Sequence, residues 1–99
     1  MSPKALHSYQ QAYELKRKEI GENAVNEDLA MYLHNIGNCY LRRRSSVEAL
    51  EHFQSALAIR KQVHGDQHVS VANTLYSIGL VYKDPMRPRC VPNVTLLSP

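Results

Sequence analysis

The sequence predicts an all-α fold in which antiparallel helix pairs stack as a short α-solenoid of about four helices. Apolar residues recur every three or four positions along most of the chain, which is the period of an α-helix. Two types of segment alternate along the chain, and each type occurs twice. Because a repeated helix pair must bury its apolar face against its neighbours, these observations favour stacked pairs. An ordinary four-helix bundle is the alternative, but it does not explain the repeat.

The repeat is visible when equivalent segments are aligned. Residues 30–40, AMYLHNIGNCY, and residues 72–82, ANTLYSIGLVY, share Ala, Leu, Ile, Gly and Tyr at an offset of 42 residues. We call this segment type A. Residues 4–22 and 48–66 share the pattern Ala-Leu-x-x-aromatic-x-x-Ala, then basic residues, Gly and an acid, at an offset of 44 residues. We call this type B, and the order along the chain is B, A, B, A.

Helices are predicted at about residues 4–20, 27–41, 46–63 and 69–83. The two B helices end in basic residues followed by Gly21 and Gly65, where a left-handed C-terminal cap is expected. The second helix begins after Asn26, a favourable N-cap residue with acidic residues in the following turn. The third begins at Ser45-Ser46-Val47-Glu48, which predicts a capping box.

Small residues inside the helices predict where the helices cross. Gly37 and Gly79 lie in the middle of the two A helices, where Gly costs about 1 kcal/mol relative to Ala. We therefore expect each glycine to mark a close helix–helix contact. The predicted core around these crossings consists of Leu33, Ile36, Tyr40, Leu50 and Phe53.

Composition and motifs exclude several classes of function. The charge of +3 comes from basic residues that are mostly interleaved with acids, and no apolar run reaches membrane-spanning length. Cys39 and Cys90 form no C-x-x-C pair, and the N-terminal residues lack a secretory pattern, so we expect free thiols in a cytoplasmic protein. His64 and His68 bracket Gly65 and are not expected to share a helical face. We expect no catalytic residues, no metal and no cofactor.

The residues Leu33, Ile36, Gly37, Tyr40, Ala49, Phe53 and Ala56 resemble the motif of the tetratricopeptide repeat family. The resemblance covers about residues 4–83, as a half repeat (4–21), a full repeat (27–64) and a half repeat (69–83). The 42-residue spacing and the joint G-D-x-H-x-x-V-A at residues 65–72 look most like the long repeats of kinesin light chain. We expect these helical repeats in residues 1–83.

The segment 84–99 contains four prolines in sixteen residues and has no helical period, so it is predicted to be an irregular tail. A further B segment does not follow Tyr82. The sequence therefore predicts a truncated repeat array.

The resemblance implies a non-catalytic protein–protein interaction module that holds a peptide or partner helix on the concave face of its A helices. Arg42 and Lys83 favour an acidic partner. The groove residues that the resemblance implies are Met31, His34, Asn35, Asn38, Leu41, Arg42, Asn73, Tyr76, Ser77, Leu80 and Lys83.

Two alternative functions stay open. Self-association, or capping of a longer array, is predicted if Leu75, Ile78 and Tyr82 are left partly exposed. A basic nucleic-acid-binding helical domain is the second alternative, supported only by Arg42-Arg43-Arg44. The same residues precede Ser45 and make it a candidate phosphorylation site for a basophilic kinase. A membrane partner is not expected.

Overall fold

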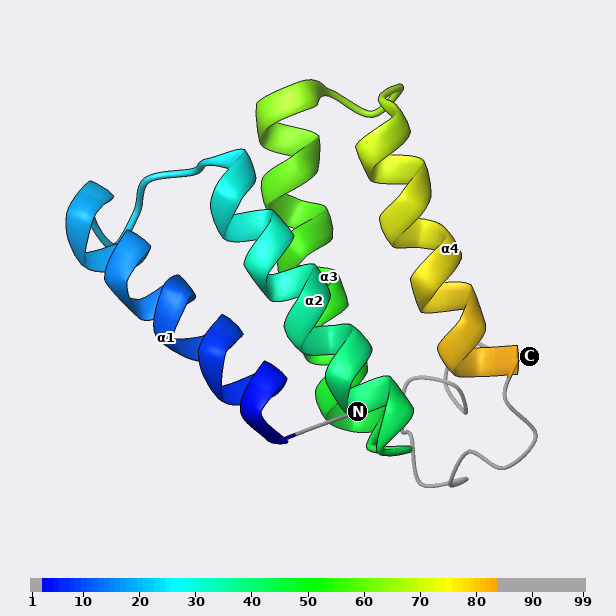
Figure 1. The fold of residues 1–99 in the computed structure, drawn as a ribbon. Helices are drawn as coiled ribbons and strands as arrows, with labels where there is room; N and C mark the ends of the chain where they lie inside the picture. Colours follow the sequence, from blue (N-terminus) through cyan, green and yellow to red (C-terminus); the bar gives the residue numbers. More distant parts are fainter. Residues whose placement is uncertain (1–2, 84–99) are drawn as a thin grey trace.

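The computed structural model describes residues 3–83, and four α-helices make up most of this range (Figure 1). They are α1 (Pro3–Ile20), α2 (Glu27–Arg42), α3 (Ser46–His64) and α4 (Val69–Lys83). Every predicted helix boundary agrees with the structure to within one residue, so the all-α prediction is confirmed. The predicted irregular tail, residues 84–99, lies outside the described residues.

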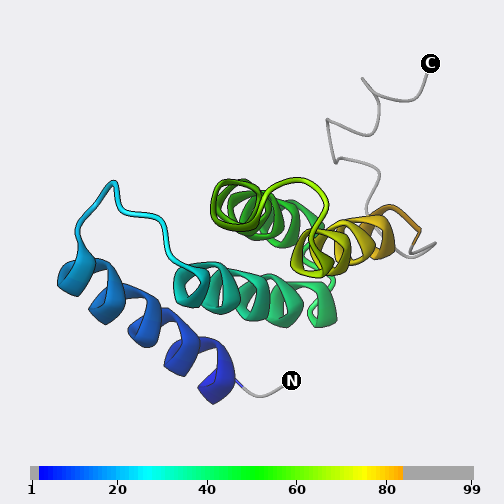
Figure 2. The ribbon, with the colours of Figure 1, turned by 90° about the horizontal axis from the view of Figure 1, so that it is seen from above.

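The helices pack in the order of the chain. α1 packs on α2, α2 on α3 and α3 on α4, while α2 also touches α4. Successive helices run in opposite directions, and α3 lies behind α2 and α4 in the view of Figure 1, as the view from above shows (Figure 2). α2 and α4 therefore lie on one face of the molecule.

No helix within residues 3–83 has the length and hydrophobicity needed to span a membrane.

Three apolar clusters hold these helices together. In one, residues of α2 pack against Ala56 and Ile59 of α3, and Tyr13 of α1 joins them. In a second, Phe53 lies between α2 and α4, next to Val81. In the third, Leu6 of α1 packs against Ile36 and Cys39 of α2. The largest fully buried side chains are Phe53, Leu29, Val71, Val81, Thr74 and Cys39.

The close helix crossing predicted at Gly37 is confirmed, whereas the one predicted at Gly79 is wrong for the described residues. A Cβ added at Gly37 would lie 2.7 Å from Cδ1 and from Cε1 of Phe53. A Cβ added at Gly79 would meet no atom within 4 Å. The reason is that Gly37 faces α3, whereas the equivalent side of α4 carries no helix among residues 3–83.

The N-terminal caps of α2 and α3 differ. The Oδ1 atom of Asn26 accepts a hydrogen bond from the backbone N–H of Asp28 at 2.6 Å, as predicted. The capping box predicted at Ser45 is wrong, because the Ser45 side chain makes no capping hydrogen bond. Its ψ is 79°, compared with 139° at Asn26, and its own N–H donates to the Tyr40 carbonyl at 2.9 Å. That N–H is therefore not available to the Glu48 side chain.

Both C-terminal glycines have a positive φ, as expected for the ends of the B helices. The φ of Gly21 is 102° and that of Gly65 is 86°. The ψ of Gly65 is 169°, whereas ψ is about 47° in the left-handed helical conformation, so the left-handed cap expected at this position is wrong. Only glycine reaches such a conformation without strain.

Candidate interaction surfaces

A buried arginine joins three helices. Arg60 lies on α3 and is only 8% exposed. Its Nη2 donates to Oε2 of Glu27 on α2 at 3.0 Å, and its Nη1 donates to Oγ1 of Thr74 on α4 at 2.8 Å. The Ser70 carbonyl accepts a longer bond of 3.3 Å from Nη1. Because a buried guanidinium is costly unless it is paired, these contacts fix α2, α3 and α4 relative to one another.

His34 lies where α2 meets α4 and next to this arginine. Its Nδ1 lies 3.4 Å from Nη1 of Arg60, and its Nε2 lies 3.2 Å from Oγ of Ser77. Arg60 can only donate, so we assign Nδ1 as the acceptor and Nε2–H as the donor to Ser77. Burial, together with the positive charge of Arg60, lowers the pKa of His34 below its ordinary value. The site therefore favours the neutral imidazole.

Glu27 also binds His64, at the end of α3. Nε2 of His64 lies 2.8 Å from Oε1 of Glu27. The ring of His68 stacks on that of His64, with centroids 3.9 Å apart and an angle of 11° between the planes. As expected, the two histidines do not share a helical face, because His68 lies after the end of α3, but the turn at Gly65 brings their rings together. Within residues 3–83, no three His, Cys, Asp or Glu side chains are grouped to hold a metal ion.

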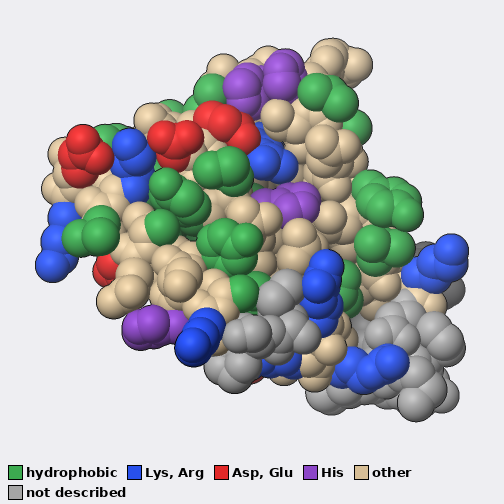
Figure 3. All heavy atoms as spheres, viewed as in Figure 1, with side chains coloured by type: hydrophobic (Ala, Val, Ile, Leu, Met, Phe, Trp, Pro, Cys, Tyr) green, Lys and Arg blue, Asp and Glu red, His purple; other side chains and the backbone are tan. Residues whose placement is uncertain are grey.

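The predicted groove residues all lie on α2 and α4, and we call the surface they form the α2–α4 face. The structure brings His34 and Ser77 together, and Ser77 is buried between the helices. Met31, Arg42, Asn73, Tyr76 and Lys83 are exposed, whereas Asn35, Asn38, Leu41 and Leu80 are half-buried with His34. Hydrophobic, acidic and basic side chains are mixed on the side of the molecule seen in Figure 3.

Sequence reasoning missed four residues that organise this region: Glu27, Arg60, His64 and Thr74. Glu27 was interpreted only as a favourable acid in the first turn of its helix. Arg60 belongs to the basic end of a B helix, a position that usually lies in solvent. The one available signal was its place on the same side of α3 as the core residues Phe53 and Ala56, three or four residues apart along the helix.

A groove of about 510 Å³ lies between α3 and α4, and we call it the α3–α4 groove. Of the residues predicted for self-association, Leu75 is exposed, while Ile78 and Tyr82 are half-buried. The residues lining this groove are Gln54, Leu57, Ala58, Lys61, Leu75, Ile78 and Tyr82.

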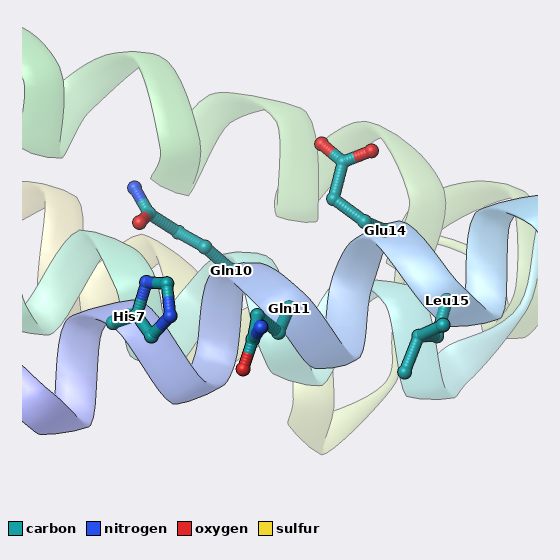
Figure 4. Close-up of a pocket in the computed structure, with 5 residues that line it drawn as sticks. All are labelled: His7, Gln10, Gln11, Glu14 and Leu15. Atoms are coloured by element: carbon teal, nitrogen blue, oxygen red, sulfur yellow. The ribbon is translucent and has the colours of Figure 1, made fainter.

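A second, smaller concavity of about 360 Å³ runs along α1 alone. His7, Gln11 and Leu15 lie along one side of the helix, and Gln10 and Glu14 along the other (Figure 4).

The two cysteines and Ser45 are the remaining predicted positions. Cys39 is a buried free thiol on α2, and Cys90 lies outside the described residues. Ser45 is half-buried in the turn between α2 and α3, with exposed arginines before it.

Comparison with known protein families identifies a repeat family. The model of the tetratricopeptide repeat family matches residues 27–84, which is more than half of the 99 residues. The comparisons with curated proteins and with solved structures found no match.

Proposed function

Because this chain belongs to the tetratricopeptide repeat family, we propose that it is a non-catalytic protein–protein interaction module that binds a peptide or partner helix on its α2–α4 face. The observation that carries the proposal is the composition of this face. Tyr76 and Met31 are exposed apolar side chains on neighbouring helices, with Asn35, Asn38 and Asn73 beside them. Such side chains can cover the apolar residues of a ligand and pair with its backbone.

Rigid support for this face also favours binding. The contacts of Arg60 with Glu27 and Thr74 fix the spacing of α2 and α4 from behind. His34 and Ser77 close the seam between the two helices. A ligand that crosses both helices then meets a surface that is already ordered, which lowers the entropic cost of binding.

We propose that the preferred ligand is acidic. Arg42 and Lys83 lie in the last turns of α2 and α4, and both are exposed. Both helices run in the same direction, so these two cations lie at the same end of the face. The guanidinium of Arg42 and the ammonium of Lys83 can each donate hydrogen bonds to a carboxylate of the ligand.

The test is a displayed peptide library selected on the full chain, followed by affinity measurements with two variants. The variant Asn38→Ala, Tyr76→Ala should bind the selected peptide at least about tenfold more weakly. The control Gln62→Ala, Val63→Ala changes exposed positions of α3 and should bind as the wild type does. Equal loss in both variants, or none in either, would contradict the proposal.

Self-association is the second candidate, and the exposure of Leu75 beside the α3–α4 groove favours it. As a capping module, the chain would present this groove to a longer array. Nucleic-acid binding through Arg42-Arg43-Arg44 is the weakest candidate. It requires affinity for RNA or DNA that falls steeply with salt, and Ser45 phosphorylation would then oppose it.

The finer family assignment is also part of the proposal. The 42-residue offset and the long B helix of 19 residues support repeats like those of kinesin light chain, in a truncated array. We propose a cytoplasmic location on the same sequence grounds as above. Fractionation of cells that express a tagged chain would test it.

A further inference from the structure

The complete helix pair of this chain shows how its two unpaired helices could be covered. α2 and α3 form a complete pair of an A helix and a B helix. Within residues 3–83, α4 is an A helix without a following B helix, and α1 is a B helix without a preceding A helix. Each residue of α4 is equivalent to the α2 residue 42 positions earlier, and each residue of α1 to the α3 residue 44 positions later. The two open helices are therefore the two halves of one repeat.

The side of α4 that corresponds to the α3-binding side of α2 is open. Leu33 is 7% exposed under α3, whereas its equivalent Leu75 is 49% exposed. Gly37 is buried against the Phe53 ring, whereas Gly79 is exposed with open space where a Cβ would lie. The α4 surface thus has the small residue and the apolar side chain that a B helix needs, but no B helix.

The side of α1 that corresponds to the α2-binding side of α3 is open in the same way. Ile59 is 8% exposed in the complete pair, whereas its equivalent Leu15 is 68% exposed. Phe53 is fully buried, whereas its equivalent Tyr9 is only half-buried, beside the cluster of Leu6, Ile36 and Cys39. An A helix would cover exposed Leu15 and the uncovered part of Tyr9.

One polar pair in the complete repeat is replaced by apolar residues at the equivalent positions of both open helices. In the complete pair, Glu27 of α2 binds His64 of α3. The equivalent residues are Val69 of α4, which is 66% exposed, and Ile20 of α1, which is half-buried beside the cluster of α2 and α3 residues. A polar contact within the chain is thus matched by two apolar residues on the two open helices. Apolar residues at both positions suit each other and do not suit a polar partner.

The chain's own C-terminal segment is a poor occupant for the groove beside α4. α3 is a helix of 19 residues, but Pro85, Pro88, Pro92 and Pro99 leave no stretch longer than six residues without proline in 84–99. Proline in a helix interior removes a hydrogen bond and clashes with the preceding turn. A B helix from elsewhere fits this groove better.

We propose that two copies of this chain associate head to tail, with α1 of one copy seated on α4 of the other as α3 is seated on α2. Tyr9 of the second copy then lies over Gly79, as Phe53 lies over Gly37. Leu15 covers the region of Val71 and Leu75, and Ile20 meets Val69. The new pair completes one repeat from two halves. This inference goes beyond peptide binding and specifies the self-association candidate above.

Head-to-tail contacts leave one open end on each side, so the assembly does not close at the dimer. The association should therefore add copies one at a time. The α2–α4 face takes no part in the contact, which uses the opposite side of α4, and each added copy extends that face.

The experiment is sedimentation equilibrium of the full chain at concentrations up to about 1 mM. The average mass should rise continuously and pass the dimer without a plateau. Gly79→Gln fills the space over α4 and should weaken association at least about tenfold, while circular dichroism confirms an unchanged helix content. Leu15→Glu should do the same from the α1 side. Val63→Glu, an exposed position of α3, is the matched control and should assemble as the wild type does.

A mixture of the two blocked variants gives the sharpest result. Gly79→Gln keeps an intact α1 surface, and Leu15→Glu keeps an intact α4 surface, so an equal mixture should form a dimer and nothing larger. A monomeric wild type at every concentration, a plateau at the dimer, or normal assembly of either single variant would overturn the proposal. Peptide affinity measured on monomeric Gly79→Gln tests the proposed function separately, because that variant leaves the α2–α4 face intact.

Discussion

The ring of Phe53 occupies the space in which a side chain at Gly37 would begin. With two ring carbons 2.7 Å from the position of a Cβ, no other residue fits at position 37 unless the Phe53 ring or the helices shift. This contact explains why a residue that disfavours helices lies in the middle of α2. It also sets the distance between the two helices of the complete repeat.

Gly37→Ala and Gly79→Ala should have opposite effects on stability, although the substitution is the same. Gly37→Ala overpacks a fully buried ring and should lower the free energy of unfolding by about 1–3 kcal/mol. Gly79→Ala adds a methyl group in open space and should raise it by up to about 1 kcal/mol. Urea denaturation in dilute solution measures both. Equal effects at the two positions would contradict the packing described here.

Removing the charge that faces Arg60 should destabilise the protein. Glu27→Gln leaves a buried guanidinium without its carboxylate, and because Glu27 is itself partly exposed we expect a loss of about 1–2 kcal/mol. The double variant Glu27→Leu, Arg60→Met should recover part of that loss. Glu19→Gln is the control, since Glu19 forms only an exposed ion pair with Lys16 and its removal should leave stability unchanged. A loss in the double variant that equals the sum of the losses of its two separate substitutions would contradict the proposed pairing of Glu27 with Arg60.

Stability should decrease as the pH falls below 6.5, the ordinary pKa of histidine. The folded protein lowers the pKa of His34, so over this range the unfolded chain binds the proton more readily than the folded one. The contribution is fully present above 6.5 and is lost as the pH falls through the lower pKa of the folded state. Thr74 and Ser77 contact the ring, burial and the charge of Arg60 favour its neutral form, and the carboxylate of Glu27 opposes them.

Urea denaturation at several pH values checks this dependence. His34→Gln should have a shallower dependence of stability on pH than the wild type between about pH 5 and 7. His7→Gln retains His34 and should keep the wild-type dependence. Identical dependences in wild type and His34→Gln would show that His34 is not responsible.

Arg17 should hold the connection between α1 and α2 in place. Its Nη1 donates to the carbonyls of Ala24 at 2.8 Å and Gly21 at 3.1 Å, and its Nη2 donates to the Tyr13 hydroxyl at 3.1 Å. Arg17→Met should make amide hydrogen exchange in residues 21–26 roughly fivefold faster, with little change in α3. The exposed Lys18→Met is the control. Faster exchange throughout the chain would indicate a global rather than a local effect.

Most of the fold could be predicted from the sequence because each of the two helix types occurs twice in the chain. The helical period, Asn26 and the two C-terminal glycines are local signals, and local structure follows from them. Ser45 is the exception: its residue types suit a capping box, but the chain enters α3 from a tight turn in which Arg44 has a φ of 63°. That turn fixes the Ser45 backbone in a conformation from which its side chain does not cap the helix.

The polar contacts could not be predicted, because they join residues that are far apart in the chain. Glu27 and Arg60 are 33 positions apart, and His34 and Ser77 are 43. No local sequence pattern indicates which of the arginines has a buried side chain. The repeat also predicted a close helix contact at Gly79 that the structure does not contain. Gly79 is the equivalent of Gly37, but no helix among the described residues covers it.

Amide chemical-shift mapping with a peptide selected on the full chain tests the central claim most directly. It is made on monomeric Gly79→Gln, so that assembly does not contribute. We expect shifts along α2 and α4, at Asn35, Asn38, Asn73 and Tyr76. Shifts confined to Gln54, Leu57 and Lys61 in the α3–α4 groove, or to α1, would contradict it.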